Sequence, residues 1–282
     1  MKNYIIILNS MALLIGLISY GQSNILNATT PEEIGIQNLD QMQSDQDSFL
    51  EYDYIDDRDI LWSKIVYEKI DLNERLNFPL LFPINDETYE RNRKSLWRVL
   101  KENIVNKTIT KLYFNRNDNF KDPMTYQDVM EVISLTEMIN GIAMEPEVLK
   151  SIDISAYRIK GMWYFDKRQG EMRYRLLGIM PIGKNIKDDD GKNNTDLFWV
   201  WYPSIRKILH KELVFNDTNN ANRISFDQLL VSRRFSSYIY KEDNIYGDRS
   251  IKDYKKPGLE SILESERIKK EILDFEQDMW NR

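Results

Sequence analysis

The spacing of apolar residues changes twice along the chain and predicts helices first, strands in the middle and helices last. Between residues 56 and 72, Trp62, Val66 and Ile70 stand four apart behind an acidic start. This spacing is typical of a helix with one buried face, and acidic residues suit a helix N-terminus. We therefore expect a first helix here, followed by an extended, proline-containing connection over residues 77–85.

Two more helices are expected in the first half of the chain. One covers residues 90–105, where Leu96, Leu100 and Ile104 fall on one side. The other covers residues 124–139. Both keep the three-to-four-residue spacing of an amphipathic helix.

Alternation replaces helical spacing in the middle of the chain. Residues 152–183 predict two strands joined by a turn at Asp166–Gly170, and residues 197–203 predict a further, buried strand. The polar run 183–195 between them is expected to be a loop. The segment 204–215 is compatible with helix, from its charges, or with strand, from its flanks.

The last part of the chain returns to helical spacing. A short helix is expected over residues 224–235, with Ser225 as its N-cap. A long closing helix is expected over residues 258–280, because apolar residues recur every three or four positions behind Pro257. The whole order predicts an α+β fold with a single main domain, residues 56–282, in which helices at both ends flank a central antiparallel sheet.

The N-terminal residues predict an exported protein. One lysine precedes an apolar run, and small residues precede Gln22, as in a secretory signal peptide over residues 1–21. The alternative is an uncleaved anchor, but the run is shorter than the ~20 residues that span a bilayer. No cysteine follows the expected cleavage site, so we expect no direct membrane anchor.

A polar, acidic arm is predicted over residues 22–55, because it has too little apolar surface to offset the entropy of ordering. Two interpretations remain open for it. It is either an unstructured leader or a segment that orders on a partner through apolar anchors, namely Ile34, Ile36, Leu39, Phe49 and Tyr52.

Composition excludes several functional classes. The 282-residue chain has 42% hydrophobic and 30% charged residues and a net charge of −6, which argues against a nucleic-acid-binding surface. It has no cysteine and one histidine, His210, so a zinc site, a cysteine nucleophile and a histidine triad are disfavoured. Nucleotide-binding glycine motifs are absent, and the acidic run near Gly191 fails as a calcium loop at its two ends. We expect no catalytic residue, no metal and no cofactor.

Arginine and tyrosine density is the remaining signal. Protein interfaces favour Tyr, Trp and Arg, because these residues bury a large area at low entropy cost. The stretch from Ser232 to Arg249 is rich in them and predicts a partner interface, or the frame that shapes one. Its candidate residues are Arg233, Arg234, Tyr238, Tyr240, Tyr246 and Arg249.

Several long blocks resemble one family. The sequences WYFDKRQGEMRYRLLGIMPI, LFWVWYP, ISFDQLLVSRRFSSYIYKEDNIYGDR and DFEQDMW are similar to the GldN/PorN family, and DDRDILWSKIVYEKIDLNERLNFPL resembles its N-terminal part. The resemblance covers the chain after the signal peptide and is weakest in the arm and in the loop 184–195.

The resemblance implies a non-catalytic structural component of the type IX secretion and gliding motility machinery of Bacteroidetes-type bacteria. Family members are periplasmic and form a ring by self-association with a GldK/PorK-type lipoprotein, through which they associate with the outer membrane. They also meet the GldM/PorM-type periplasmic shaft. The alternative from the residues alone is a periplasmic carbohydrate-binding protein or hydrolase, with the aromatic residues as a sugar platform.

Overall fold

The computed structural model describes residues 49–86, 93–136, 138–139, 142–143, 146–188, 193–214, 224–245 and 247–280. Residues Phe49–Arg282 form one compact unit. The predicted signal peptide and most of the predicted arm lie outside the described residues, so both stay predictions.

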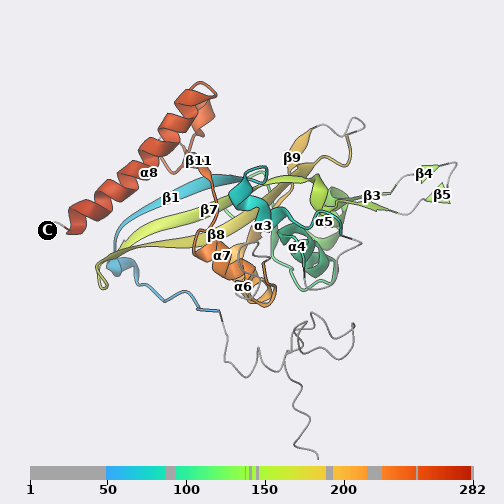
Figure 1. The fold of residues 1–282 in the computed structure, drawn as a ribbon, viewed down its shortest axis with the longest axis horizontal. Coiled ribbons are helices and arrows are strands. Elements are labelled where there is room, and N and C mark those ends of the chain that lie inside the picture. Colours follow the sequence, from blue (N-terminus) through green and yellow to red (C-terminus); the bar gives the residue numbers. More distant parts are fainter. Residues whose placement is uncertain are drawn as a thin grey trace, which may run out of the picture. The chain divides into compact units, whose positions relative to one another are not determined.

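A seven-stranded antiparallel sheet forms the centre of this unit (Figure 1). Its longest strands come from the hydrophobic segments of the chain, and β9 (Asn194–Asp196) pairs with β8 beside the main path. The spatial order of the main path is β11 (Tyr238–Glu242), β1 (Ile60–Asp71), β7 (Ile154–Asp166), β8 (Glu171–Lys184), β10 (Phe198–Trp201) and β2 (Leu112–Phe114).

Helices and short pairings complete the fold and confirm the predicted α+β class. The helices are α3 (Phe78–Leu81), α4 (Leu96–Val105), α5 (Tyr126–Ile133), α6 (Tyr202–Lys211), α7 (Phe226–Val231) and α8 (Leu259–Trp280). Two short strand pairs are β3 (Ser134–Leu135) with β6 (Glu147–Val148), and β4 (Met138–Ile139) with β5 (Ile142–Ala143). The 3-10 turns are η2 (Asp57–Asp59), η3 (Arg75–Asn77), η4 (Ser151–Asp153) and η5 (Ile251–Asp253).

The predicted hairpin is confirmed. Strands β7 and β8 pair from Ile154–Gly183 to Asp166–Glu171, and the turn residue Gly170 has a φ of 68°, a left-handed conformation that suits glycine. The Gly170 amide donates to the Asp166 carbonyl at 2.7 Å and closes the turn.

The predicted first helix is wrong, because residues 60–71 form strand β1. Residues 62, 66 and 70 are separated by even numbers, so they share a face in a strand as well as in a helix. Lys64 and Glu68 lie on that same face, and because they are charged they interrupt the alternation of apolar and polar residues that marks a strand. The fold pairs both: Lys64 with Glu242 and Glu271, and Glu68 with Arg233.

Other boundaries also differ from the expectations. The connection 77–85 contains the short helix α3, with Pro79 in its first turn. The third predicted helix ends at Ile133, where Ser134 is extended and starts β3. Residues 204–215, for which helix and strand both remained possible, begin within helix α6. The structure confirms four other predicted elements: α4, α7 with its Ser225 cap, β10 and α8.

Two apolar clusters stabilise the unit. The larger one lies where α4, α6 and α7 meet the sheet, and its largest fully buried side chains are Trp97, Tyr157, Phe198, Tyr202 and Phe226. The smaller one lies under α8 and consists of Val66, Ile239, Ile251, Ile268 and Ile272. Helix α8 is therefore attached by its own small cluster.

The last residues of the predicted arm pack on this unit. The Tyr52 hydroxyl donates to the Leu176 carbonyl at 3.3 Å, and its ring lies 4.1 Å from the guanidinium carbon of Arg206. Arg175 donates to the Asp53 carbonyl at 2.6 Å. Phe49 lies near Arg206 too. Phe49 and Tyr52, which we considered as anchors for a partner, thus contact β8 and α6 of the same chain.

Candidate interaction surface

Arg233, the first residue of the predicted interface, is part of an internal ion pair. Its guanidinium donates to both carboxylate oxygens of Glu68, at 2.9 and 2.7 Å. Glu68 is 1% exposed and also accepts a hydrogen bond from the Ser237 hydroxyl. Burial lowers the pKa of Arg233, but the hydrogen bonds and charge of Glu68 outweigh it and leave this pKa above its ordinary value.

Aromatic rings surround the same guanidinium. Its central carbon lies 4.3 Å from the ring centre of Tyr174 and 5.4 Å from those of Trp163 and Phe235. Burial raises the pKa of the Tyr174 hydroxyl. The side chain of Arg233 therefore contacts β1 and β8 inside the fold. It supports the predicted interface from within.

Arg234 and Tyr238 are exposed, and hydrogen bonds fix the backbone between them. Between them, the Ser236 amide donates to the Asn77 side-chain oxygen at 2.8 Å, and Asn77 Nδ2 donates to the Ser236 carbonyl at 3.0 Å. The same Nδ2 donates to the Asp71 carbonyl at 2.7 Å. The buried Asn77 thus joins the end of β1, the turn before α3 and the start of β11.

Large exposed apolar side chains stand beside Asn77 in the chain. Leu76, Phe78 and Phe82 are all exposed, and the two phenyl rings meet edge to face with centroids 5.3 Å apart. Sequence reasoning missed them, because two prolines suggested only a connection. The signal that identifies them is the density of large apolar residues in such a connection. We call the set the aromatic–arginine surface: Leu76, Phe78, Phe82, Arg234 and Tyr238.

Two other predicted interface residues, Tyr240 and Arg249, have separate contacts. Tyr240 is partly buried between the Tyr67 ring, 6.3 Å away, and the Arg158 guanidinium, 4.8 Å away, and burial raises its pKa. Arg249 is exposed, with its guanidinium 5.6 Å from the Tyr254 ring. Tyr246 lies outside the described residues, so its role stays a prediction.

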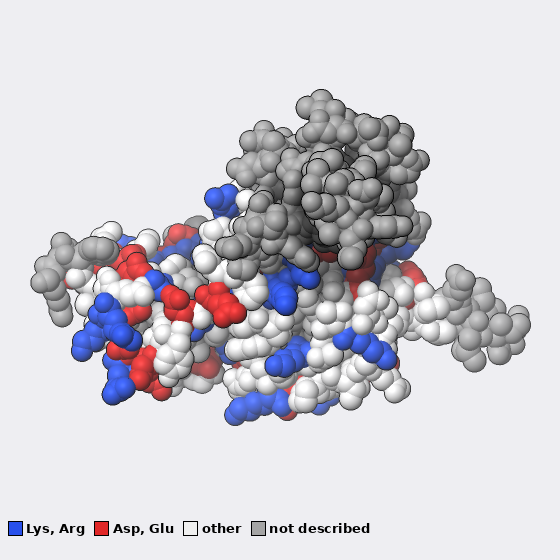
Figure 2. Space-filling view, turned by 90° about the horizontal axis from the view of Figure 1, so that it is seen from below, with Lys and Arg blue, Asp and Glu red and all other residues white. Residues whose placement is uncertain are grey.

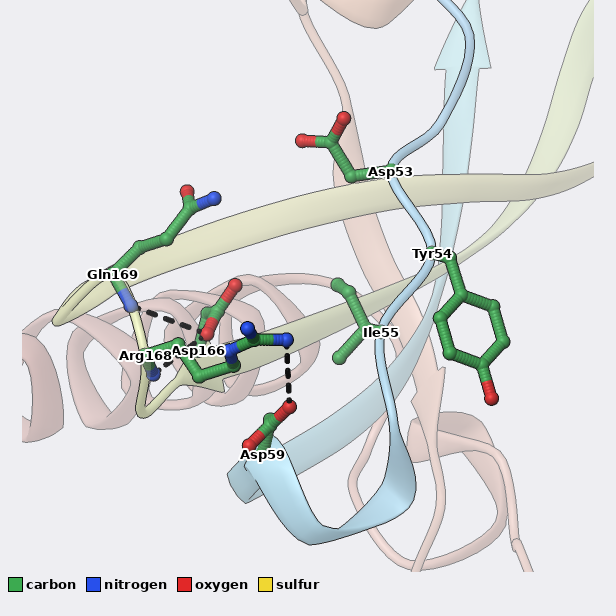
Figure 3. A pocket seen from close by; sticks show the side chains of 7 residues that line it. All are labelled: Asp53, Tyr54, Ile55, Asp59, Asp166, Arg168 and Gln169. Carbon is green, nitrogen blue, oxygen red and sulfur yellow. Dashed lines mark hydrogen bonds and ion pairs between the residues drawn. The ribbon is translucent and has the colours of Figure 1, made fainter.

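A pocket of about 350 Å³ lies at the β7–β8 turn and contains three aspartates (Figure 3). Its three aspartates and Arg168 already have structural partners. Asp166 accepts hydrogen bonds from the amides of Arg168 and Gln169, and Arg168 pairs with Asp59 at 3.5 Å (Figure 3). These contacts hold the turn against η2, so we assign the pocket to the structure of the hairpin.

Within the described ranges, no group of three or more His, Cys, Asp or Glu side chains is placed to hold a metal ion. His210 is buried in α6, with its ring centroid 6.2 Å from that of Phe49. None of the helices that the structure describes has the length and apolar character to cross a bilayer.

Acidic and basic side chains lie beside each other at the left end of the face in Figure 2.

Comparison with known proteins identifies the family. A family model described as "Gliding motility associated protein GldN" matches residues 55–281, which is most of the chain. A search among curated proteins found no match. The matched range begins just before β1 and includes the whole sheet and all described helices, and it confirms the resemblance found in the sequence. The chain therefore belongs to the gliding motility associated GldN family, which makes it a component of the gliding motility and type IX secretion machinery.

Proposed function

We propose that this chain is a non-catalytic structural component that assembles into a periplasmic ring of the type IX secretion machinery. The ring contains many copies of the chain and a GldK/PorK-type lipoprotein, through which it associates with the outer membrane. It also contacts a GldM/PorM-type shaft. The observation that carries the proposal is the family match over residues 55–281.

The surface chemistry supports an assembly role. The aromatic–arginine surface combines exposed aromatic, apolar and arginine side chains, the types that dominate protein interfaces. In the pocket with three aspartates, Asp166 and Asp59 hold the β7–β8 turn, and Asp53 pairs with Arg173. Many weak contacts repeated around a ring give a stable assembly through avidity.

The experiment is purification of the tagged chain from envelope extract, followed by electron microscopy of the eluate. We expect ring particles that contain the lipoprotein. A chain that stays monomeric and whose melting temperature rises with glycans contradicts the proposal, because a ligand that binds only the folded state stabilises it.

A surface variant and a matched control test where assembly occurs. We expect Phe78→Ser with Arg234→Glu to lose the ring particles while the folded monomer persists, because both side chains are exposed. The control, Tyr126→Ser with Lys252→Glu, changes the same types of exposed residue elsewhere and should keep them. Equal assembly of both variants contradicts a role for this surface.

A further inference from the structure

The outer edge of strand β8 is open over the part that follows the hairpin turn. Residues 171–177 pair with β7 on one side. On the other side, β10 pairs with β8 only at residues 178–179, and β9 pairs with it at residues 182–184. No strand of the described chain pairs with residues 171–177 from that side. An open edge presents unpaired backbone groups and can accept a further extended segment.

Residues 49–55, which we call the strap, lie along this edge and close it through side chains. The Tyr52 hydroxyl donates to the Leu176 carbonyl at 3.3 Å, and Arg175 donates to the Asp53 carbonyl at 2.6 Å. Within the part of the chain that the structure describes, no backbone–backbone hydrogen bond joins the strap to a strand. The strap therefore covers the edge without becoming a strand of the sheet.

Three arginines give the edge a preference for aromatic and acidic residues. Arg173 pairs with the carboxylate of the strap's aspartate at 2.7 Å. The guanidinium carbons of Arg175 and Arg206 lie 4.9 and 4.1 Å from the ring centre of Tyr52. Arg206 also lies 5.0 Å from the ring centre of Phe49. Cations attract both ring faces and carboxylates, so the edge fits an extended segment with two aromatic residues three positions apart and then an acidic one.

Few contacts hold the strap in place. The side chains of Leu50 and Tyr54 are 87% and 90% exposed. A pocket of about 350 Å³ lies between strap residues 53–55 and the hairpin turn (Figure 3). The buried Nε of Arg175 has no hydrogen-bond partner among the described residues. Segments with so few packed contacts open locally while the rest of a domain stays folded.

We propose that the outer edge of β8 is a docking edge for an extended acidic segment and that the strap is its built-in occupant. The strap opens without unfolding of the domain. When closed, it denies the edge to other strands; when open, residues 171–177 accept a segment of the same chemistry. Closure still adds to the stability of the whole protein, because global unfolding requires the strap to open. This inference does not depend on the ring function.

A peptide with the strap's own sequence tests the docking edge on the full chain. The probe is a fluorescein-labelled peptide of residues 46–57, and fluorescence anisotropy measures its binding. The natural strap is tethered beside the edge at a high effective concentration and should exclude the probe. Tyr52→Ala with Asp53→Ala weakens the strap. We expect this variant to bind one peptide per chain, at least about tenfold more tightly than the natural chain does.

Leu50→Ala with Tyr54→Ala is the matched control, because both side chains belong to the strap and are exposed. This variant should exclude the peptide as well as the natural chain does. Equal affinities of the two variants overturn the proposal. A Tyr52/Asp53 variant that loses the near-UV circular dichroism of the natural chain also overturns it, because the strap would then be indispensable to the fold.

Arginine variants locate the bound peptide. Arg173→Glu, added to the weakened strap, should lower the affinity by at least about tenfold, because it reverses the charge that faces the peptide's aspartate. Arg116→Glu is the control: it makes the same charge change at an exposed arginine just after β2, a strand at the end of the sheet path. Binding that survives Arg173→Glu, or that both variants weaken equally, overturns the placement of the site on β8.

Discussion

At the scale of single residues, the Arg233–Glu68 pair explains how charged groups lie inside this sheet. Glu68 is buried on β1, and Arg233 reaches it from just after α7. Arg233 has a φ of 54°, in the left-handed region that non-glycine residues rarely adopt. This backbone conformation is maintained by hydrogen bonds from Arg233 and Arg234 back to Leu230 and Leu229 at the end of the helix.

We predict that Glu68→Ala destabilises the protein by about 3–5 kcal/mol, because it leaves a largely buried guanidinium without its counter-charge. The free energy of unfolding from urea denaturation measures this loss. Arg168→Ala, which removes a pair with a largely exposed arginine, should change it by at most about 1 kcal/mol. Similar losses in the two variants contradict the structural role of the Glu68 pair.

At the scale of elements, α8 is held by a small cluster and by ion pairs at its border. Ile268 is 0% exposed in the cluster, whereas Ile262, six residues earlier, is 58% exposed. Glu271 on α8 pairs with Lys64 of β1 at 2.9 Å and with Arg267 at 3.0 Å. Helix α8 thus contains a buried isoleucine, an exposed isoleucine and a glutamate whose ion pairs depend on pH.

We expect Ile268→Ala to lower the free energy of unfolding by about 2–5 kcal/mol through lost burial and a cavity. The identical substitution at Ile262 should change it by no more than about 0.5 kcal/mol, since no packed contact is lost. Urea denaturation of the monomeric protein compares the two. An equal effect would mean that α8 packs differently from the arrangement described here.

Acid should weaken the attachment of α8. Burial alone raises the pKa of Glu271, but hydrogen bonds and charge from Lys64 and Arg267 outweigh it and lower this pKa below its ordinary value. A carboxylate with a lowered folded-state pKa contributes stability above its unfolded pKa of about 4.3 and loses it as pH falls through the folded value. The protection of α8 amides against hydrogen exchange, taken relative to their intrinsic exchange rate at each pH, should therefore fall below about pH 4.3.

Glu271→Gln is the control for this pH effect. Because glutamine does not titrate, the protection factors of α8 amides should change less between neutral and acidic pH in the variant than in the natural chain. An unchanged pH dependence in the variant would assign the acid effect to other carboxylates at the same border, such as Glu264, whose pKa is also lowered.

At the scale of the whole molecule, the folded unit begins before the first strand. Residues Phe49–Ile55 run beside β8, where Asp53 pairs with Arg173 at 2.7 Å and Tyr52 covers the buried Arg206–Asp227 pair. Burial raises the pKa of Tyr52 to about 12. This segment therefore shields an internal ion pair from water, and the N-terminal boundary of the folded unit lies at Phe49.

We predict that Tyr52→Ala lowers the free energy of unfolding by about 1–3 kcal/mol, from the lost ring–guanidinium contact and hydrogen bond. Tyr54→Ala is the matched control two residues away, and its 90% exposed ring should make a difference of at most about 0.5 kcal/mol. Thermal or urea unfolding of the full chain distinguishes them. No loss in the Tyr52 variant would place this segment outside the cooperative unit.

The sequence by itself determined the elements whose periodicity is unambiguous. The β7–β8 hairpin alternates over many residues around a turn with glycine, and α7 and α8 carry a cap or a regular apolar stripe. It also determined the family and the density of arginine and aromatic residues around residue 233. These features depend on neighbours in the chain, so local patterns are sufficient to predict them.

Only the tertiary structure decided the features that depend on distant partners. Strand β1 carries Lys64 and Glu68 on a covered face, and that arrangement is stable because α8, β11 and Arg233 supply opposite charges from more than 160 residues away. The same holds for the predicted interface: Arg233 is turned inward by its pair with Glu68, and Asn77 joins its own segment, with exposed Leu76 and Phe78, to Ser236 between Arg234 and Tyr238. Burial and exposure of these side chains follow from packing between distant segments, which the local pattern does not contain.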